Sequence, residues 1–338
     1  MSRPWPPGAV TGLGSLPGTD PDEAARLLFG ELPELPHVAE LPARGPGADL
    51  IGRGAALLVD LATEIVPSGW RLTSRPGRDL RRAQDFLSRD LDALEAGADG
   101  YAGALKLQLA GPWTLAAGLE LKSGHKVVSD HGATRDLAES LAEGLRRQIA
   151  DVASRIPAAR LVVQVDEPSL PAVLGARVPT PSGFGTVRAV DASVVEHALR
   201  DILDIAPEGT RAVHCCAADV PIALLRRAGA DAVAVDAAWL DTGHYDALGE
   251  LIEAGGSLWL GVLPATDSAI TFAAARTTVR RLWSELGFAE DQLAASVVPT
   301  PACGLAGASP AYTRTALAVL RDVGRDLVDP VPDSADAS

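Results

Sequence analysis

The sequence predicts an α/β fold in the form of a (β/α)8 barrel. Eight short apolar segments recur along the 338 residues, and most are followed by a stretch with the periodicity of an amphipathic helix. Apolar strands that alternate with helices indicate a parallel sheet covered on both faces. Eight such units fit a barrel of this chain length, with a doubly wound sheet as the alternative. The expected strands span residues 9–14, 37–41, 105–110, 161–166, 211–215, 232–236, 257–263 and 296–300.

Five of the intervening stretches have the pattern of an amphipathic helix. In the first of them, Leu80, Leu87, Leu91 and Leu94 return to nearly the same face. Glycine and proline punctuate residues 45–77, which we expect to form either an extended loop or an inserted short helix. The expected helices span residues 78–96, 137–156, 194–205, 270–286 and 312–327.

Composition and charge limit the class of protein. Apolar residues make up 47% of the chain, enough for one large barrel or two smaller domains. We expect a single barrel over residues 1–328 and a disordered tail at 329–338. The formal net charge of −14 argues against nucleic acid or a membrane surface as a partner. Three clustered cysteines form no disulfide framework, which favours a cytoplasmic location. We see no secretory signal and no apolar run of membrane-spanning length.

The chemically distinctive residues lie where expected strands end. The carboxyl ends of all strands in a (β/α)8 barrel meet at one face, which carries the active site. We therefore expect these residues to converge, although they are spread over almost the whole chain. They are Gly14, Ser15, Glu40, Asp166, His214, Cys216, Asp236, Asp267 and Cys303.

Two of these strand ends predict a metal site. Side chains alternate along a strand, so His214 and Cys216 share one face and Cys215 takes the other. An imidazole and a sulfur on one face, with the distant Cys303 as a third ligand, suit zinc. Asp236 ends the neighbouring strand and is either a fourth ligand, a partner of a ligand, or a helix cap.

Acidic groups at other strand ends indicate binding of an amino group. Asp166 and Glu167 follow a buried strand, where carboxylates need cationic or hydrogen-bonding partners. They either bind a substrate ammonium or cap a helix. Glu40 is a further strand-end carboxylate, or a solvated loop residue. Trp113 is either a wall for a flat ligand or a core residue.

A loop near the start of the chain has the composition of an anion-binding turn. Gly14 and Ser15 belong to a Gly-Leu-Gly-Ser-Leu-Pro stretch whose backbone N–H groups suit a carboxylate. The same composition is also common in ordinary turns.

Taken together, these motifs resemble the catalytic C-terminal domain of the cobalamin-independent methionine synthase family, in the superfamily that also holds uroporphyrinogen decarboxylase. The resemblance covers about residues 8–325. The five motifs that carry it are Thr-Gly-Leu-Gly-Ser-Leu-Pro from Thr11, Gln-Leu-Ala-Gly-Pro from Gln108, Gln-Val-Asp-Glu-Pro from Gln164, His-Cys-Cys from His214 and Pro-Ala-Cys-Gly-Leu from Pro301.

The resemblance implies a zinc ion and a role for each ligand. Zinc would be held by His214, Cys216 and Cys303, with Asp236 standing where the family has a glutamate. The reaction implied is methyl transfer to the thiol of homocysteine, giving methionine. Zinc suits this chemistry because the thiolate is the nucleophile and a free thiol is mostly protonated at neutral pH.

The resemblance also implies how homocysteine is bound. Gly14 and Ser15 correspond to the turn that holds the substrate carboxylate. Asp166 corresponds to the aspartate that holds the ammonium group, and Glu40 to its second partner, on a weaker local match.

Two departures from the family concern the methyl donor. Full-length members carry an N-terminal domain that helps bind a polyglutamylated folate, and a histidine that protonates the leaving nitrogen. Here we find no such domain, and residues 261–268 offer Thr266 and Asp267 but no histidine. We therefore expect methylcobalamin or a methyl-corrinoid protein as the methyl donor, because the corrinoid cobalt gives up the methyl group without being protonated. The alternative is methyltetrahydrofolate, with Asp267 or a water supplying the proton.

Two other functions stay open from the sequence. One is a non-catalytic or repurposed barrel that binds zinc or thiols. The other is a decarboxylase of the uroporphyrinogen type, which would need cationic groups that a chain with three lysines and an acidic balance hardly supplies.

Overall fold

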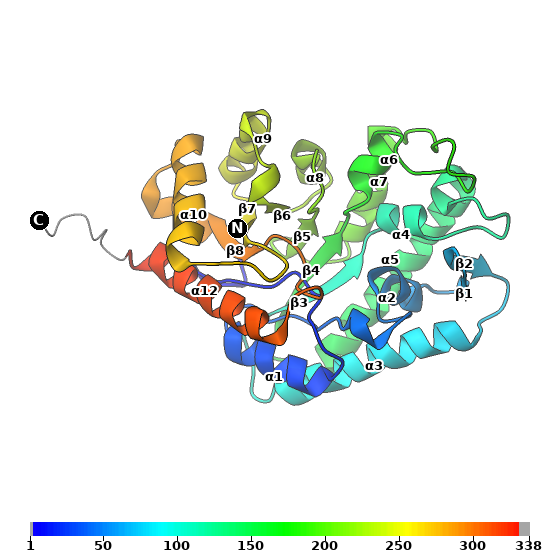
Figure 1. Ribbon diagram of the computed structural model, residues 1–338, viewed down its shortest axis with the longest axis horizontal. Helices are drawn as coiled ribbons and strands as arrows, with labels where there is room; N and C mark the ends of the chain where they lie inside the picture. Colours follow the sequence, from blue (N-terminus) through cyan, green and yellow to red (C-terminus); the bar gives the residue numbers. More distant parts are fainter. Residues whose placement is uncertain (1–2, 331–338) are drawn as a thin grey trace, which may run out of the picture.

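A computed structural model describes residues 3–330, so most of the expected tail lies outside the described residues. Six strands form one curled parallel sheet in chain order, with helices around its outside (Figure 1). This confirms the α/β class and six of the expected strands. They are β3 (Ala104–Ala110), β4 (Arg160–Asp166), β5 (Arg211–His214), β6 (Ala232–Asp236), β7 (Ser257–Leu263) and β8 (Val297–Pro301).

The first two expected strands are not strands in the structure. They make only isolated bridges, Ser15 with Glu40 and His37 with Lys106. The Glu40 N–H donates to the Gly14 carbonyl at 3.1 Å, and the Thr11 N–H donates to the Pro299 carbonyl of β8 at 3.4 Å. Gly12 and Gly14 interrupt the first segment, and Pro36 and Pro42 bound the second on both sides, so no continuous ladder forms. The two segments still lie beside the edge strands β3 and β8.

Helices surround the sheet, and the five expected from periodicity are confirmed. Their ends lie within two residues of the predicted ones, except that the helix expected from 137 begins at His131. Those five are α3 (Arg78–Gly97), α5 (His131–Arg155), α7 (Ala192–Leu203), α10 (Phe272–Leu286) and α12 (Pro310–Val328). Shorter or unpredicted ones are α1 (Pro21–Glu31), α4 (Pro112–Gly118), α6 (Leu170–Leu174), α8 (Ile222–Arg227), α9 (Thr242–Glu253) and α11 (Leu293–Ser296). Within the described residues, no helix is both long and apolar enough to cross a membrane.

The punctuated stretch from 45 to 77 has more structure than we expected. It contains a short helix, α2 (Leu50–Leu57), which confirms the second of the two expectations, an inserted short helix. It also contains an antiparallel hairpin of β1 (Ala62–Val66) and β2 (Gly69–Thr73). The hairpin was missed because its strands are short and half-buried, with Thr, Glu and Arg among the apolar residues.

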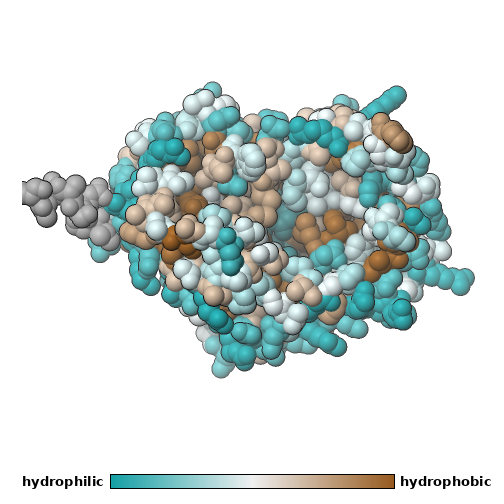
Figure 2. Space-filling view, viewed as in Figure 1, coloured by the Kyte–Doolittle hydropathy of each residue, from teal (hydrophilic) through white to brown (hydrophobic). Residues whose placement is uncertain are grey.

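The sheet separates two sets of side chains by alternation. Outward residues such as Leu107, Val165 and Leu260 pack against the helices. Inward residues at the amino-terminal end of the strands are apolar, including Trp259 and Val162. Figure 2 shows a hollow near the middle of the viewed face, with apolar residues in it and hydrophilic ones along the edge.

Inward residues nearer the carboxyl end of the strands are polar. They are Lys106 and Gln108 on β3, Gln164 and Asp166 on β4, His214 on β5 and Thr300 on β8, and all are buried. Burying so many polar groups is costly unless each finds a partner or a ligand. This end of the sheet therefore is where a functional site is expected.

Candidate metal centre

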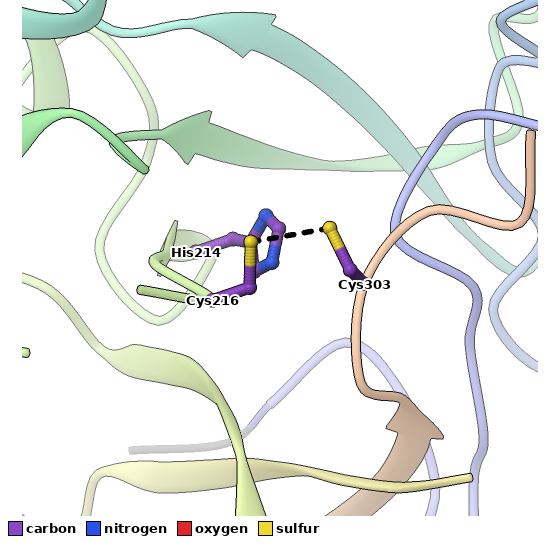
Figure 3. Close-up of side chains that lie close together, drawn as sticks. All are labelled: His214, Cys216 and Cys303. Carbon is purple, nitrogen blue, oxygen red and sulfur yellow. Dashed lines mark hydrogen bonds between the residues drawn. The ribbon is translucent and has the colours of Figure 1, made fainter. Parts of the chain in front are cut away.

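His214, Cys216 and Cys303 come together at the carboxyl ends of β5 and β8. Their ligand atoms lie within 4.8 Å of one another, and the two sulfurs are 3.1 Å apart. Figure 3 shows the three side chains pointing toward one another, His214 from the end of β5 and the two cysteines from the loops after β5 and β8. Cys215 packs in the opposite direction, in the outer core, as alternation predicts. The predicted convergence of residues 87 positions apart is confirmed.

Backbone hydrogen bonds fix the two loops that carry the ligands. The Cys215 N–H donates to the Ala234 carbonyl of β6 at 3.0 Å, which carries the strand pairing one residue past His214. The Ala302 N–H donates to the Leu263 carbonyl of β7 at 2.7 Å. Each loop is thus held by the neighbouring strand, which leaves little freedom in where the sulfurs lie.

The imidazole of His214 is oriented by a carboxylate. Its Nδ1 lies 2.8 Å from Asp166 Oδ1, and a carboxylate acceptor requires the proton to be on Nδ1. Its Nε2 is buried and has no hydrogen-bond partner among the described residues. A histidine held by a carboxylate, with the other nitrogen free, is the usual arrangement of a metal-binding histidine. One free nitrogen beside two sulfurs fits zinc.

The protonation of the three groups is coupled. The hydrogen bond between the sulfurs lowers the pKa of Cys303 to about 4, with His214 adding to the effect against burial. The same bond and burial raise the pKa of Cys216. Burial lowers the pKa of His214, but Asp166 and Cys303 outweigh it and raise the pKa to about 9. A metal ion binds these atoms only when they carry no proton, so metal affinity at this site would depend on pH.

Asp236 lies beside this group but is not part of it. A cavity of about 540 Å³ is lined by Asp236, Cys216 and Cys303, together with residues of β7 and Arg281 of α10. Asp236 Oδ1 accepts from the Ala238 N–H at 2.9 Å, so the carboxylate caps a short turn, one of the roles left open by the sequence. Burial and the charge of Cys303 raise its pKa.

The loop of Gly14 and Ser15 lies against the loop of Cys303. The Leu305 N–H donates to the Ser15 carbonyl at 2.7 Å, and a Cβ placed on Gly304 would lie 2.0 Å from Ser15 Oγ. A side chain at Gly304 would therefore require Ser15 to move. Gly14 has a φ of +126°, which favours glycine. A Cβ at this position would point toward the Glu40 carboxyl group.

Glu40 is buried and belongs to a chain of charges that the sequence analysis missed. Its Oε1 lies 3.6 Å from Nε of Arg53 on α2, and Arg53 also pairs with the buried Asp90 of α3. Arg44 binds the same Asp90 at 2.8 Å. Burial raises the pKa of Glu40 to about 7, with the charge of Asp166 adding to it and Arg53 opposing. No periodicity marked Arg53, because it lies in the punctuated stretch.

Lys106 is a second residue that the sequence analysis missed. Its ammonium group is fully buried and donates to the Gly12 carbonyl and to Gln164 Oε1. Gln164 Nε2 in turn donates to Asp166 Oδ1 at 2.7 Å. Burial lowers the pKa of Lys106 to about 7 against the charges of Asp166 and Glu40. The available signal was the alternation of Lys106 and Gln108 with leucines in β3.

Asp166 and Glu167 point in opposite directions. Glu167 accepts from the N–H groups of Trp113 and Thr114, at 3.0 and 2.7 Å, and from the Thr114 hydroxyl at 2.7 Å. It therefore caps α4, not the helix that follows it. Trp113 is a core residue, since its ring is buried and its Nε1 donates to Val195 O.

Asp267 is the predicted residue that the structure leaves outside the cluster. Its carboxylate is fully exposed and accepts from the Ser309 N–H at 2.7 Å, which lowers its pKa. A carboxyl group that is ionised so readily is a poor proton donor near neutral pH. The role of Asp267 as an acid stays a prediction.

Comparison with known proteins places this site in a family. The family model for the catalytic domain of cobalamin-independent synthases matches residues 9–326. The chain belongs to this family. Membership makes it an enzyme, a methyltransferase of the methionine synthase type. A comparison with curated proteins gives no match.

One solved structure shares the fold of this chain, and a second shows a weaker likeness. A B12-independent methionine synthase from Shewanella sp. W3-18-1, in complex with selenomethionine, aligns with a TM-score of 0.61 and 14% identity over 96% of this chain and 98% of that chain. A GH5_18 protein from Streptomyces cattleya, in complex with GlcNAc, aligns with a TM-score of 0.46 and 13% identity over 96% and 81%. At 14% identity the first likeness shows a shared fold and no more.

Proposed function

We propose that the protein is a zinc-dependent methyltransferase that converts homocysteine to methionine in a single (β/α)8 catalytic barrel over residues 1–328. The observation that carries the proposal is the group of His214, Cys216 and Cys303 beside Asp166, at the carboxyl ends of the strands. Free thiols in all three cysteines are consistent with a cytoplasmic location. A barrel of the uroporphyrinogen decarboxylase type would use no such sulfur pair.

His214, Cys216 and Cys303 would hold the zinc ion, with Asp236 as the proposed fourth ligand. When bound, zinc supplies the positive charge that lets a thiol lose its proton near neutral pH. Asp166 keeps the His214 Nδ1 protonated and so leaves Nε2 free for the ion. To act as a ligand, Asp236 would use the oxygen that does not cap Ala238.

Residues on the other side of the sulfurs would hold the amino acid. The loop of Gly14 and Ser15 would offer backbone N–H groups to the homocysteine carboxylate. Asp166 makes both of its hydrogen bonds through Oδ1, so Oδ2 can face the substrate ammonium. Glu40 would be the second acidic partner. Holding both ends of the amino acid orients its sulfur toward the methyl donor.

For the donor we propose a methyl-corrinoid, either methylcobalamin or a methyl-corrinoid protein. The homocysteine thiolate would form a bond to the methyl carbon, while the cobalt–carbon bond breaks and both its electrons stay on cobalt. No proton is needed. The alternative, methyltetrahydrofolate, requires protonation of its leaving nitrogen. The exposure of Asp267 and the lack of a histidine in residues 261–268 favour the corrinoid.

Methionine formation with each donor offered separately tests the proposal. Zinc-loaded protein should produce methionine from homocysteine, and the Cys303→Ser variant should not. Turnover with methylcobalamin and none with methyltetrahydrofolate supports the corrinoid. The reverse result overturns the donor but leaves the methyltransferase in place. Binding of homocysteine without turnover with any donor would instead indicate a non-catalytic barrel.

A further inference from the structure

Gln108 occupies the inner face of the sheet next to the residues proposed to bind the amino acid. It lies on β3 and pairs in register with Gln164 of β4, two residues before Asp166. A Cβ placed on Gly14 would lie 3.2 Å from Gln108 Nε2 and 3.2 Å from Glu40 Cδ. The Gly14 loop, Glu40 and Gln108 thus meet at one point inside the sheet.

The amide of Gln108 has a defined orientation. Its Nε2 donates to the Val38 carbonyl at 2.6 Å. Nε2 also faces Glu40, and this contact lowers the carboxyl pKa against the larger effect of burial. An amide nitrogen has two N–H groups, so these two acceptors use both. A flipped amide would set two oxygens against each other at Val38.

The other end of the same amide has no partner. Gln108 is 3% exposed, and its Oε1 is buried without a hydrogen bond among the described residues. The neighbouring Gln164 amide uses both of its N–H groups on Leu13 and Asp166. Lys106 donates to Gly12 and Gln164 and makes no hydrogen bond to Gln108 Oε1. A buried carbonyl oxygen without a donor is costly, which indicates that a ligand supplies one.

We infer that Gln108 Oε1 is a third acceptor for the ammonium group of the amino-acid substrate, with Asp166 and Glu40 as the other two. An ammonium group has three N–H donors, so three acceptors satisfy it fully. A neutral amide completes the set without adding a third negative charge to two buried carboxylates. This inference rests on the proposed function, because it takes homocysteine as the substrate.

A comparison of two thiols tests the role of Gln108. Homocysteine and 4-sulfanylbutanoic acid share the thiol and carboxylate, but only homocysteine has the amino group. Their dissociation constants for zinc-loaded protein are measured by calorimetry, for wild type and Gln108→Met. We expect the wild type to prefer homocysteine, and Gln108→Met to reduce that preference by about 10-fold or more. An unchanged preference, as when Oε1 binds only a buried water, overturns the inference.

The same substitution elsewhere provides a matched control. Gln148 on α5 is also buried with an unpaired Oε1, and it is not part of the proposed site. Gln148→Met should leave the preference for homocysteine as in wild type. A similar loss of preference in both variants would overturn the assignment to Gln108. Zinc content measured in each sample separates loss of metal from loss of the ammonium contact.

Two further outcomes are informative. If Gln108→Met does not fold, Gln108→Glu keeps an acceptor in the same place, and the preference should stay equal to that of wild type or widen. A narrowed preference in Gln108→Glu would overturn the inference. If the wild-type protein binds homocysteine no better than 4-sulfanylbutanoic acid, or binds neither, the proposed amino-acid site itself fails.

Discussion

The two ends of the space inside the sheet differ in what they contain. At the amino-terminal end, Trp5 and Trp259 stack edge to face at 5.5 Å within a cluster of buried apolar residues. At the carboxyl end, three inward atoms have no hydrogen-bond partner among the described residues: Gln108 Oε1, His214 Nε2 and Thr300 Oγ1. The same strands thus bury apolar area at one end, which stabilises the fold. At the other end they bury polar groups, which costs free energy unless a ligand supplies the missing partners.

Two adjacent residues, Asp166 and Glu167, show the same difference between a site residue and a structural residue. Asp166 faces inward and contacts His214, whereas Glu167 faces outward and is saturated by donors from α4. Strand alternation alone makes one a residue of the site and the other a structural one. Substitutions at the two ends, and at the two carboxylates, should therefore have separable effects.

The largest expected effect is on stability, at the apolar end. Trp259→Ala should lower the free energy of unfolding by about 3–5 kcal/mol, since it removes a fully buried ring from the inner core. Zinc content and the KM for homocysteine of the folded protein should stay as in wild type. Chemical denaturation measures the first and steady-state kinetics the second. A loss of zinc at unchanged stability would contradict the division of the interior.

The next largest effect concerns the metal ligands. Cys303→Ser should lower zinc affinity by more than about 100-fold, beyond what removing a supporting partner costs. The stability of the variant should change little, because the Cys303 side chain is partly exposed and lies in the loop after β8. Competition with a chelating dye measures the affinity. Unchanged zinc affinity would remove Cys303 from the site, whatever the activity.

The two carboxylates should respond differently to the same change. Asp166→Asn keeps an oxygen for His214 but loses the charge, so homocysteine affinity should fall by about 10- to 100-fold with zinc retained. Glu167→Gln should leave that affinity unchanged and lower the free energy of unfolding by about 1–3 kcal/mol, because one of the two oxygens that accept from α4 becomes an NH2 group. An equal loss of homocysteine affinity in both variants would contradict the division into one site residue and one structural residue.

The boundary between the two ends is marked by Lys106, whose ammonium lies 5.4 Å from the Trp259 ring. Its pKa of about 7 in the folded protein is below the ordinary 10.5, so between these values the unfolded chain binds more protons. The stability of wild type should therefore rise with pH over this range relative to Lys106→Met. The slope is at most about 1.4 kcal/mol per pH unit. Parallel stability curves would contradict a titrating Lys106.

Much of this organisation was predictable from the sequence. Apolar runs marked six strands, and alternation correctly separated Cys215 from His214 and Cys216. The segments at 9–14 and 37–41 were overestimated because apolar composition hides the effect of glycine and proline on pairing. Arg53 was not predictable, since its role depends on how α2 packs against α3. Asp267 looked suitable by position, but only the fold shows its exposure.

The central claim is that zinc, held by His214, Cys216 and Cys303, binds homocysteine in its thiolate form. Calorimetric titration of zinc-loaded protein at neutral pH, repeated in buffers of different ionisation enthalpy, counts the protons released on binding. The account predicts about one more proton released for homocysteine than for methionine, which has no thiol to lose one. Equal proton release for the two ligands would contradict it.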